Sequence, residues 1–181
     1  MKNGGTDRRV VKTRAALHAA MIRLLRTTKL ENMTVTMLCA EANVSRSAFY
    51  DHYSVPEDCF NEIVEEKNDW IIDQAEKKNI RDFESFLELY FSSMAENKEI
   101  FRTLFSMDAQ NTINQKIMHY YVDYLYQVYP NFPEYPELYM KYIQYGFIGI
   151  VSEWLGNDCQ GDYKTYIDMQ THLFNMFRAA G

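Results

Sequence analysis

Hydrophobic residues recur with helical spacing along most of the chain. Between residues 8 and 26, for example, Leu17, Met21 and Leu24 fall on one side of a helix. No run of alternating hydrophobic and polar residues is long enough to predict a strand. The pattern therefore predicts an all-α chain. The expected helices span about residues 8–26, 34–42, 46–52, 54 onward, 82–95, 97–106, 109–128, 136–156 and 162–179.

A short turn separates the second and third of these helices. Thr34 and Ser45 precede them as N-caps, because each hydroxyl can accept a hydrogen bond from a free amide of the first turn. Asn43 lies in the turn, and asparagine is one of the few residues other than glycine that tolerate the left-handed conformation. Such a helix pair allows one helix to lie in the major groove of DNA while the other crosses the backbone. Residues 34–53 are therefore predicted to form a helix-turn-helix.

The segment after this motif is expected to open a long fourth helix. Ser54 and Glu57 have the S-x-x-E spacing of a capping box, and Pro56 is tolerated in a first helical turn. We predict two domains. The first is a three-helix DNA-binding helix-turn-helix domain at residues 1–54, and the second is a larger helical bundle for ligand binding and dimerisation at residues 55–181.

Charge is distributed unevenly along the chain. The whole sequence has a formal net charge of −6, yet residues 1–30 hold eight basic residues and only one acidic residue, Asp7. Residues 1–53 carry a net charge of +5, which leaves −11 for the other 128 residues. This asymmetry favours an N-terminal part that meets a polyanion, although a solvated basic helix gives the same pattern.

The cysteines and the hydropathy pattern narrow the class of protein. Cys39, Cys59 and Cys159 are odd in number and widely spaced, which argues against a disulfide framework or a zinc ribbon and suits a reducing cytosol. The apolar run at residues 147–151 is too short to span a bilayer, and the polar N-terminus does not resemble a signal peptide. We therefore expect a cytoplasmic protein with no membrane partner, associated with the bacterial nucleoid when it is bound to DNA.

Sequence motifs of enzymatic chemistry are absent. The sequence has no glycine-rich phosphate loop, no nucleophile elbow and no H-E-x-x-H motif. Each histidine is isolated and is better explained as a surface or capping residue than as a metal ligand; the four are His18, His52, His119 and His172. We expect no catalysis, no metal and no cofactor.

Polar side chains gather around the predicted third helix. Arg46 is the strongest candidate for reading a base, because its guanidinium fork matches O6 and N7 of guanine. Ser45 and Ser47 flank it and can approach bases and phosphates. Three side chains at the far end can donate to phosphates, namely Tyr50, His52 and Tyr53. Taken singly, the two tyrosines are better explained as core residues and the histidine as a surface residue.

The segment from Met33 to Tyr53, MTVTMLCAEANVSRSAFYDHY, resembles the signature of the tetracycline-repressor (TetR) family. That family typically has a threonine that opens the second helix, a turn of the A-x-x-A-G-V-S type and an F/L-Y-x-H-F ending of the third helix. The most specific match is the ending Phe49-Tyr50-Asp51-His52-Tyr53. The basic first helix and the all-helical layout are similar to the family over the rest of the chain.

The resemblance implies a role for each matching position. Phosphate contacts would come from Thr34, Tyr50 and His52, and base contacts from Arg46 and Ser47. The complete set of expected DNA-binding residues is Arg9, Lys12, Thr34, Thr36, Ser45, Arg46, Ser47, Tyr50, His52 and Tyr53.

Three positions depart from the family pattern. Asn43 replaces the usual glycine, which the left-handed tolerance of asparagine makes harmless. Pro56 stands where many members carry a lysine, so one expected phosphate contact is missing. Asp51 brings a negative charge to the recognition helix, where it either accepts from a cytosine amino group or weakens binding.

The C-terminal part is rich in aromatic residues and methionine, which an ordinary helical core would also explain. The resemblance implies that this part forms a small-molecule pocket and a two-fold dimer interface. The pocket is expected at Tyr120, Tyr124, Tyr142 and Tyr145. The interface is expected at Gly146, Ile150, Trp154, Phe174 and Phe177.

These observations favour one function and leave alternatives open. We expect a sequence-specific DNA-binding transcriptional regulator, a repressor that binds a palindromic operator as a homodimer and is released by a small-molecule effector. A helical adaptor for protein partners without DNA binding is one alternative. An activator that acts with a protein partner is the other.

Overall fold

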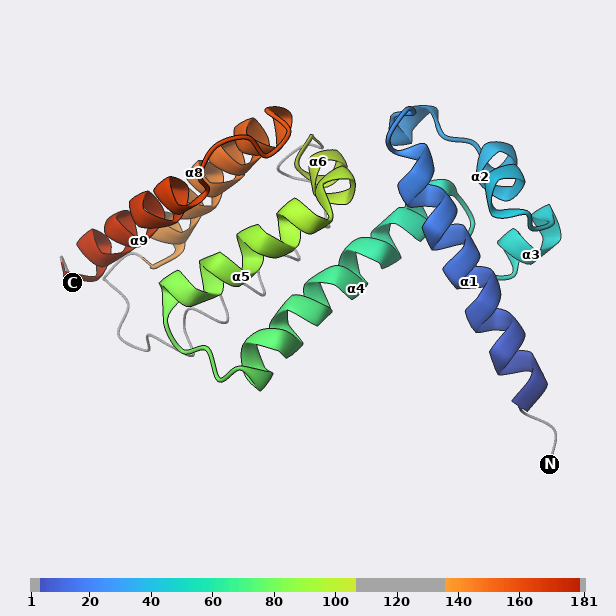
Figure 1. Ribbon diagram of the computed structural model, residues 1–181, viewed down its shortest axis with the longest axis horizontal. Coiled ribbons are helices and arrows are strands. Elements are labelled where there is room, and N and C mark those ends of the chain that lie inside the picture. The colour runs from blue at the N-terminus through green and yellow to red at the C-terminus, as the bar shows by residue number, and fades with distance from the viewer. Residues whose placement is uncertain (1–3, 107–135, 180–181) are drawn as a thin grey trace. The chain divides into compact units, whose positions relative to one another are not determined.

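The computed structural model describes residues 4–106 and 136–179, and these residues form eight α-helices, one short 3-10 helix and no strand (Figure 1). The α-helices are α1 (Gly4–Leu24), α2 (Val35–Ala42), α3 (Arg46–Tyr50), α4 (Pro56–Lys77), α5 (Phe83–Glu96), α6 (Lys98–Ser106), α8 (Pro136–Gly156) and α9 (Lys164–Ala179), with the 3-10 helix η1 at Leu30–Asn32. The predicted all-α class is confirmed. The helix expected at residues 109–128 lies outside the described residues.

The chain divides into two compact units, Met1–Glu66 and Lys67–Gly181. The N-terminal unit contains α1, η1, α2, α3 and the first part of α4, and the C-terminal unit contains the remainder. The predicted domain boundary after residue 54, with DNA binding before it and ligand binding and dimerisation after it, stays a prediction. None of the described helices combines the length and the apolar character that crossing a bilayer requires.

In the N-terminal unit, α1 packs against both α2 and α3 (Figure 1). Leu17 and Met21 of α1, Leu38 of α2 and Phe49 of α3 are completely buried. Fully burying a leucine or phenylalanine side chain is worth roughly 1.5–3 kcal/mol relative to leaving it exposed. This small apolar core therefore holds the two helices of the motif against α1.

The fourth helix begins with a different cap from the one expected. The carboxylate of Asp58, not of Glu57, accepts the backbone N–H groups of Ser54 and Val55, at 2.8 and 3.1 Å. The prediction of a capping box at Ser54 and Glu57 was therefore wrong, because Asp58 accepts from these amides instead. Because α4 starts at Pro56, Val55 is the residue that flanks the helix and Asp58 stands three positions after it.

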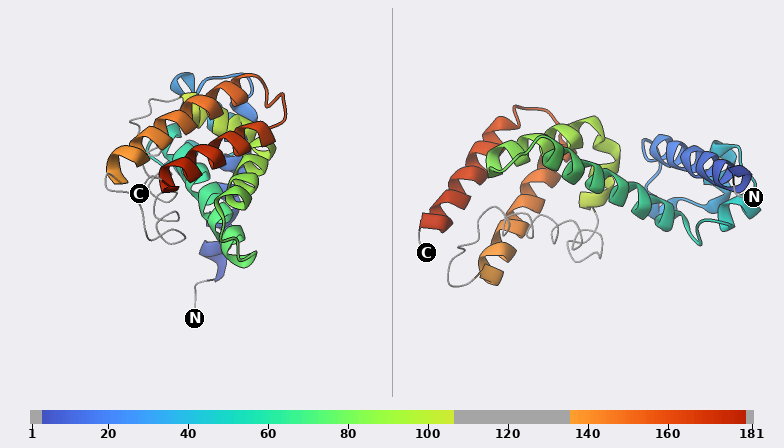
Figure 2. Two further views of the ribbon diagram at one scale, coloured as in Figure 1. Left: turned by 90° about the vertical axis from the view of Figure 1, so that its left-hand side faces the viewer. Right: turned by 90° about the horizontal axis from the view of Figure 1, so that it is seen from below.

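The C-terminal unit is built on an aromatic core. In it, α5 lies against α9 and α6 lies against α8 (Figures 1 and 2). Phe83 of α5 and Phe174 of α9 have ring centroids 4.5 Å apart, and Phe91 lies 5.3 Å from Trp154 of α8. Aromatic side chains bury large areas and gain further energy from such offset or edge contacts. The core thus joins α5 to the two C-terminal helices α8 and α9, which are distant from it in sequence.

Candidate nucleic-acid interface

The turn between α2 and α3 has the conformation that a tight helix–helix connection requires. Asn43 has φ 54° and ψ 47°, in the left-handed region, and its N–H is directed at the carbonyls of Ala40 and Cys39. The next amide, of Val44, donates to the Cys39 carbonyl at 3.0 Å. The turn therefore closes the end of α2 with backbone hydrogen bonds. The expectation that Asn43 replaces a left-handed glycine is confirmed.

Both helices of the motif have the predicted N-caps. The Thr34 hydroxyl oxygen accepts from the Met37 N–H at 3.2 Å, and the Ser45 hydroxyl oxygen accepts from the Ala48 N–H at 3.1 Å. A hydroxyl has one donor in addition to its acceptor lone pairs. Each cap therefore retains an O–H group, and both side chains are exposed. Such groups can donate to a phosphate without disturbing the helix that they cap.

Helix α3 has a buried side and an exposed side. Phe49 is completely buried and fixes the helix to the core, while Arg46 and Ser47 in the first turn are exposed. Tyr50, in the last turn, is 59% exposed. The guanidinium of Arg46 donates from Nη2 to the Thr36 hydroxyl oxygen on α2, at 2.7 Å. The structure thus brings Thr36 and Arg46 together, which no local pattern indicated.

A groove of about 450 Å³ lies between the start of α1 and the turn of the motif. Its walls carry three basic side chains and the end of α2; the lining residues are Arg8, Arg9, Lys12, Thr13, Ala16, Ala42, Asn43 and Val44. Among the residues that the structure describes, no acidic one lines it. Arg9 and Lys12, expected to contact phosphates, therefore lie beside the turn that leads into α3. Concentrated positive charge of this kind attracts the DNA backbone regardless of base sequence.

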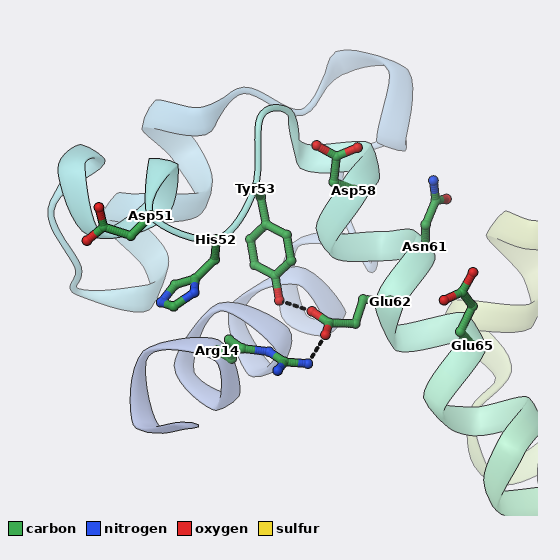
Figure 3. A pocket seen from close by; sticks show the side chains of 8 residues that line it. All are labelled: Arg14, Asp51, His52, Tyr53, Asp58, Asn61, Glu62 and Glu65. Carbon is green, nitrogen blue, oxygen red and sulfur yellow. Dashed lines mark hydrogen bonds and ion pairs between the residues drawn. The ribbon is translucent and has the colours of Figure 1, made fainter. Parts of the chain in front are cut away.

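A second cavity, of about 460 Å³, has the opposite character (Figure 3). Four carboxylates line it together with basic and neutral groups; the residues are Arg14, Asp51, His52, Tyr53, Asp58, Asn61, Glu62 and Glu65. Asp51 and His52, which directly follow α3, thus line an acidic cavity. The phosphate contact expected of His52 stays a prediction, and the carboxylates reduce the attraction for DNA on this side.

Tyr53 does not fit the role expected of it. Its side chain is only 7% exposed, and Figure 3 shows its hydroxyl pointing toward Glu62, to which it donates a hydrogen bond. Glu62 is also ion-paired with Arg14 of α1. A buried hydroxyl that already donates within the domain has no second proton to give to a phosphate. We therefore correct the assignment of Tyr53, which joins the end of the motif to α4 and α1.

The same cluster contains His18, which the sequence analysis expected to be an isolated surface or capping residue; its side chain is only 15% exposed. Nε2 of His18 lies 2.9 Å from the Tyr53 oxygen and 3.3 Å from Glu62, and Nδ1 lies 3.4 Å from Glu66. Burial lowers the pKa of His18, the carboxylate of Glu66 opposes that change, and Arg14 adds to it. Burial also raises the pKa of Tyr53, and that of the nearby Cys59 thiol, to about 12.

The cluster also offers potential metal ligands. Among the described residues, His18, Glu62 and Glu66 place one nitrogen and two carboxylate oxygens within 4.8 Å of one another. Arg14 already pairs with both carboxylates, so their charge is compensated from within the protein. The cluster is best understood as a polar connection between α1 and α4 inside the N-terminal unit.

The aromatic residues expected to form a ligand pocket are not enclosed where the structure describes them. Tyr142 and Tyr145 on α8 are 63% and 53% exposed. Tyr120 and Tyr124 lie outside the described residues.

Two of the residues expected at a dimer interface belong instead to the core. Trp154 is 1% exposed and packs on Phe91, and Phe174 is 2% exposed and packs on Phe83. Side chains enclosed by their own chain cannot contact a partner's surface, so both assignments were wrong. Gly146 is exposed and Ile150 is partly exposed, whereas the side chain of Phe177 lies outside the described residues.

Comparison with known proteins identifies the fold and the family. By sequence, no curated protein gives a significant match. Similar solved structures include the fatty acid degradation regulator FadR from Bacillus halodurans, with 14% identity, 96% of each chain covered and a TM-score of 0.70. A transcriptional regulator of the TerR/AcrR family from Aquifex aeolicus VF5 is 16% identical, with a TM-score of 0.63 over 91% of this chain and 98% of that one. NalD, the secondary repressor of the MexAB-OprM multidrug efflux pump in Pseudomonas aeruginosa, is 15% identical, with a TM-score of 0.62 over 91% and 94%.

At these identities the structural matches establish the shared fold. The family rests on a sequence match: the model for the transcriptional regulator C-terminal region of TetR proteins matches residues 81–176, more than half of the chain. The N-terminal unit adds an exposed helix-turn-helix beside a basic groove. The chain belongs to the TetR family of DNA-binding transcriptional regulators.

Proposed function

We propose that this regulator is a cytoplasmic homodimeric repressor that reads a palindromic operator with α3. The observation that carries the proposal is the exposed first turn of α3, where Arg46 and Ser47 project from a helix anchored by the buried Phe49. A short anchored helix with exposed polar side chains in its first turn suits entry into the major groove. In this arrangement Arg46 contacts a base edge, and guanine is the base that its fork matches best.

Positioning on the DNA backbone is assigned to side chains around α3. Arg9 and Lys12 in the basic groove and the capping hydroxyls of Thr34 and Ser45 supply donors for phosphates. Tyr50 is exposed and adds a donor at the end of the helix. Phosphate contacts of this kind fix orientation and register but carry no sequence information.

Dimerisation is assigned to an exposed apolar face of α8. Leu138, Tyr142 and Tyr145 are spaced i, i+4, i+7 on one side of the helix, and each is more than half exposed. Gly146 and Gly149 follow, and a Cβ added at either glycine would meet no other atom within 4 Å. A second helix can approach closely over such positions. A two-fold pair is the commonest closed assembly, and it presents two recognition helices to two half-sites.

Release by a small molecule is supported by polar atoms buried in the C-terminal unit. Tyr90 Oη and Trp154 Nε1 are buried without a hydrogen-bond partner among the described residues. Leaving a buried donor unsatisfied costs about 1–3 kcal/mol, which an acceptor atom on a bound ligand would offset. Such a ligand releases DNA only if it binds better to a conformation whose recognition helices are incorrectly spaced.

Selection of bound genomic fragments tests the DNA-reading part of the proposal. The purified protein should enrich fragments that share a palindromic sequence with half-site centres about 34–36 Å apart. Unrelated fragments that bind only at low salt would contradict sequence-specific reading, because non-specific binding is almost entirely electrostatic.

A reporter gene behind the selected operator tests the direction of control. Expression should fall when the regulator is supplied, and should recover when its effector is added. Expression that rises with the regulator would show an activator instead. Light scattering at micromolar concentration tests the assembly, and the mass of a single 21.4 kDa chain would overturn the dimer.

A further inference from the structure

The arginine proposed to read a base is already held in the free protein. Arg46 opens α3, and Thr36 is the second residue of α2. The Arg46 Nη2 donates to the Thr36 hydroxyl oxygen at 2.7 Å, so the two helices of the motif are joined by their side chains as well as by the turn. Both side chains are exposed.

The threonine is suited to orient the arginine. A threonine in a helix is largely restricted to two χ1 rotamers, so the hydroxyl of Thr36 has few positions from which to hold the arginine. Arg46 has five N–H donors in a planar fork, and the bond to Thr36 uses one of them. The remaining donors can still engage a base. An unrestrained arginine, by contrast, must give up much of its rotamer freedom when it binds.

We propose that Thr36 is a positioning residue that orders Arg46 before DNA arrives, so that the choice of one base pair in each half-site depends on both helices of the motif. This inference rests on the proposed function, because it assumes that Arg46 reads a base. It assigns to Thr36 an action through Arg46 and not a contact of its own with DNA. The cost of ordering the arginine is met when the protein folds and is then absent when the operator binds.

Two other roles for Thr36 make opposite predictions. If Thr36 contacts DNA itself, its removal weakens binding whether or not Arg46 is present. If the bond is a latch that must open before Arg46 can reach the base, its removal strengthens binding. A double-mutant cycle with Arg46 separates these roles, because it measures whether the two residues act together.

The experiment measures binding of the full-length protein to the selected operator and to single-base variants in one half-site. The test variant is Thr36→Val, which removes the hydroxyl and keeps the β-branched shape. Thr36→Ser restores the hydroxyl. Thr27→Val is the matched control, because Thr27 is also exposed in the N-terminal unit and its hydroxyl faces only the Leu24 carbonyl. Thermal unfolding of each variant verifies the fold.

Thr36→Val should reduce discrimination at the base pair read by Arg46 by about 2- to 12-fold, which is the value of ordering one long side chain beforehand. Thr36→Ser should recover most of the loss, and Thr27→Val should have no effect. In an Arg46→Ala background, Thr36→Val should change binding by less than about 2-fold. The salt dependence should stay unchanged in every Thr36 variant, because no phosphate contact is removed.

Several results would overturn the inference. These are unchanged discrimination in Thr36→Val, tighter operator binding, or a loss of equal size in the Arg46→Ala background. Failure of the proposed function looks different, because the wild-type protein would then show no preference among the single-base variants. A wild-type preference that Arg46→Ala removes and Thr36→Val leaves intact refutes only the positioning role.

Discussion

Residues of the basic groove should position the protein on the DNA backbone, whereas Arg46 on α3 should read the base sequence. Lys12 lines the groove together with Arg8 and Arg9, whereas Arg46 projects from the first turn of α3. Lys12→Ala removes one positive charge per protomer from the surface proposed to contact the DNA backbone. Arg46→Ala removes the only long basic side chain of α3.

The two substitutions should change different measured quantities, the salt dependence of binding for Lys12→Ala and the base preference for Arg46→Ala. Each phosphate contact contributes about 0.9 to the slope of log K against log salt on duplex DNA, so Lys12→Ala should reduce the slope by about 0.9 for each protomer and about 1.8 for a dimer. The affinity loss should be nearly the same for every DNA sequence. Arg46→Ala should cost on the order of 1–3 kcal/mol per half-site on the operator and relax preference at one base pair.

The assay is equilibrium binding to the operator and to a panel of single-base variants at several salt concentrations. Lys29→Ala is the charge-matched control, because the Lys29 side chain is 81% exposed and does not line the groove. Its slope should equal that of the wild-type protein. Equal slope changes in Lys12→Ala and Lys29→Ala would refute the assignment of the groove. A uniform loss across the panel in Arg46→Ala would make that residue a phosphate clamp and not a reader.

The remaining predictions concern stability and assembly. Asn43→Ala should lower the free energy of unfolding by about 1–2 kcal/mol in a urea titration, and Asn43→Gly by clearly less, because the residue has a φ of 54°. Phe174→Ala should cost about 3–5 kcal/mol through the cavity that it leaves against Phe83, and a loss below 1 kcal/mol would contradict its burial. Burial lowers the pKa of His18 from its usual value of 6.5, so the unfolded chain binds this proton before the folded protein does as the pH falls. The free energy of unfolding should therefore decrease below about pH 6.5. His18→Gln should lessen that decrease, as measured by chemical unfolding at pH 7.5 and 5.5. Tyr142→Glu should yield a folded monomer by light scattering and circular dichroism, and a persistent dimer would move the interface away from α8.

The sequence by itself determined the local features of this protein. The N-caps at Thr34 and Ser45 and the left-handed Asn43 each depend on one side chain and the few amides next to it. Helical periodicity likewise indicated nearly every described helix, because a repeat of three or four residues records which side is buried. The basic N-terminal segment was visible for the same reason, since its charges are neighbours in the sequence.

The tertiary structure decided which side of each helix meets the core. An aromatic residue on a helix with two apolar sides fits a core or an interface equally well in sequence, and Trp154 and Phe174 were assigned to the wrong one. Tyr53 shows the same limit at the end of the motif. Its spacing of four residues from the buried Phe49 placed both on one side of the chain, which was the available signal for its burial.

Contacts between residues far apart in the chain could not be predicted at all. His18 meets Tyr53 and Glu62 across separations of 35 and 44 residues, and Arg46 meets Thr36 across a turn. Local propensity specifies none of these contacts, because each depends on how α1, α2, α3 and α4 pack once their apolar sides are buried. Sequence therefore determined the helices and their charge, whereas packing determined which polar side chains share a site.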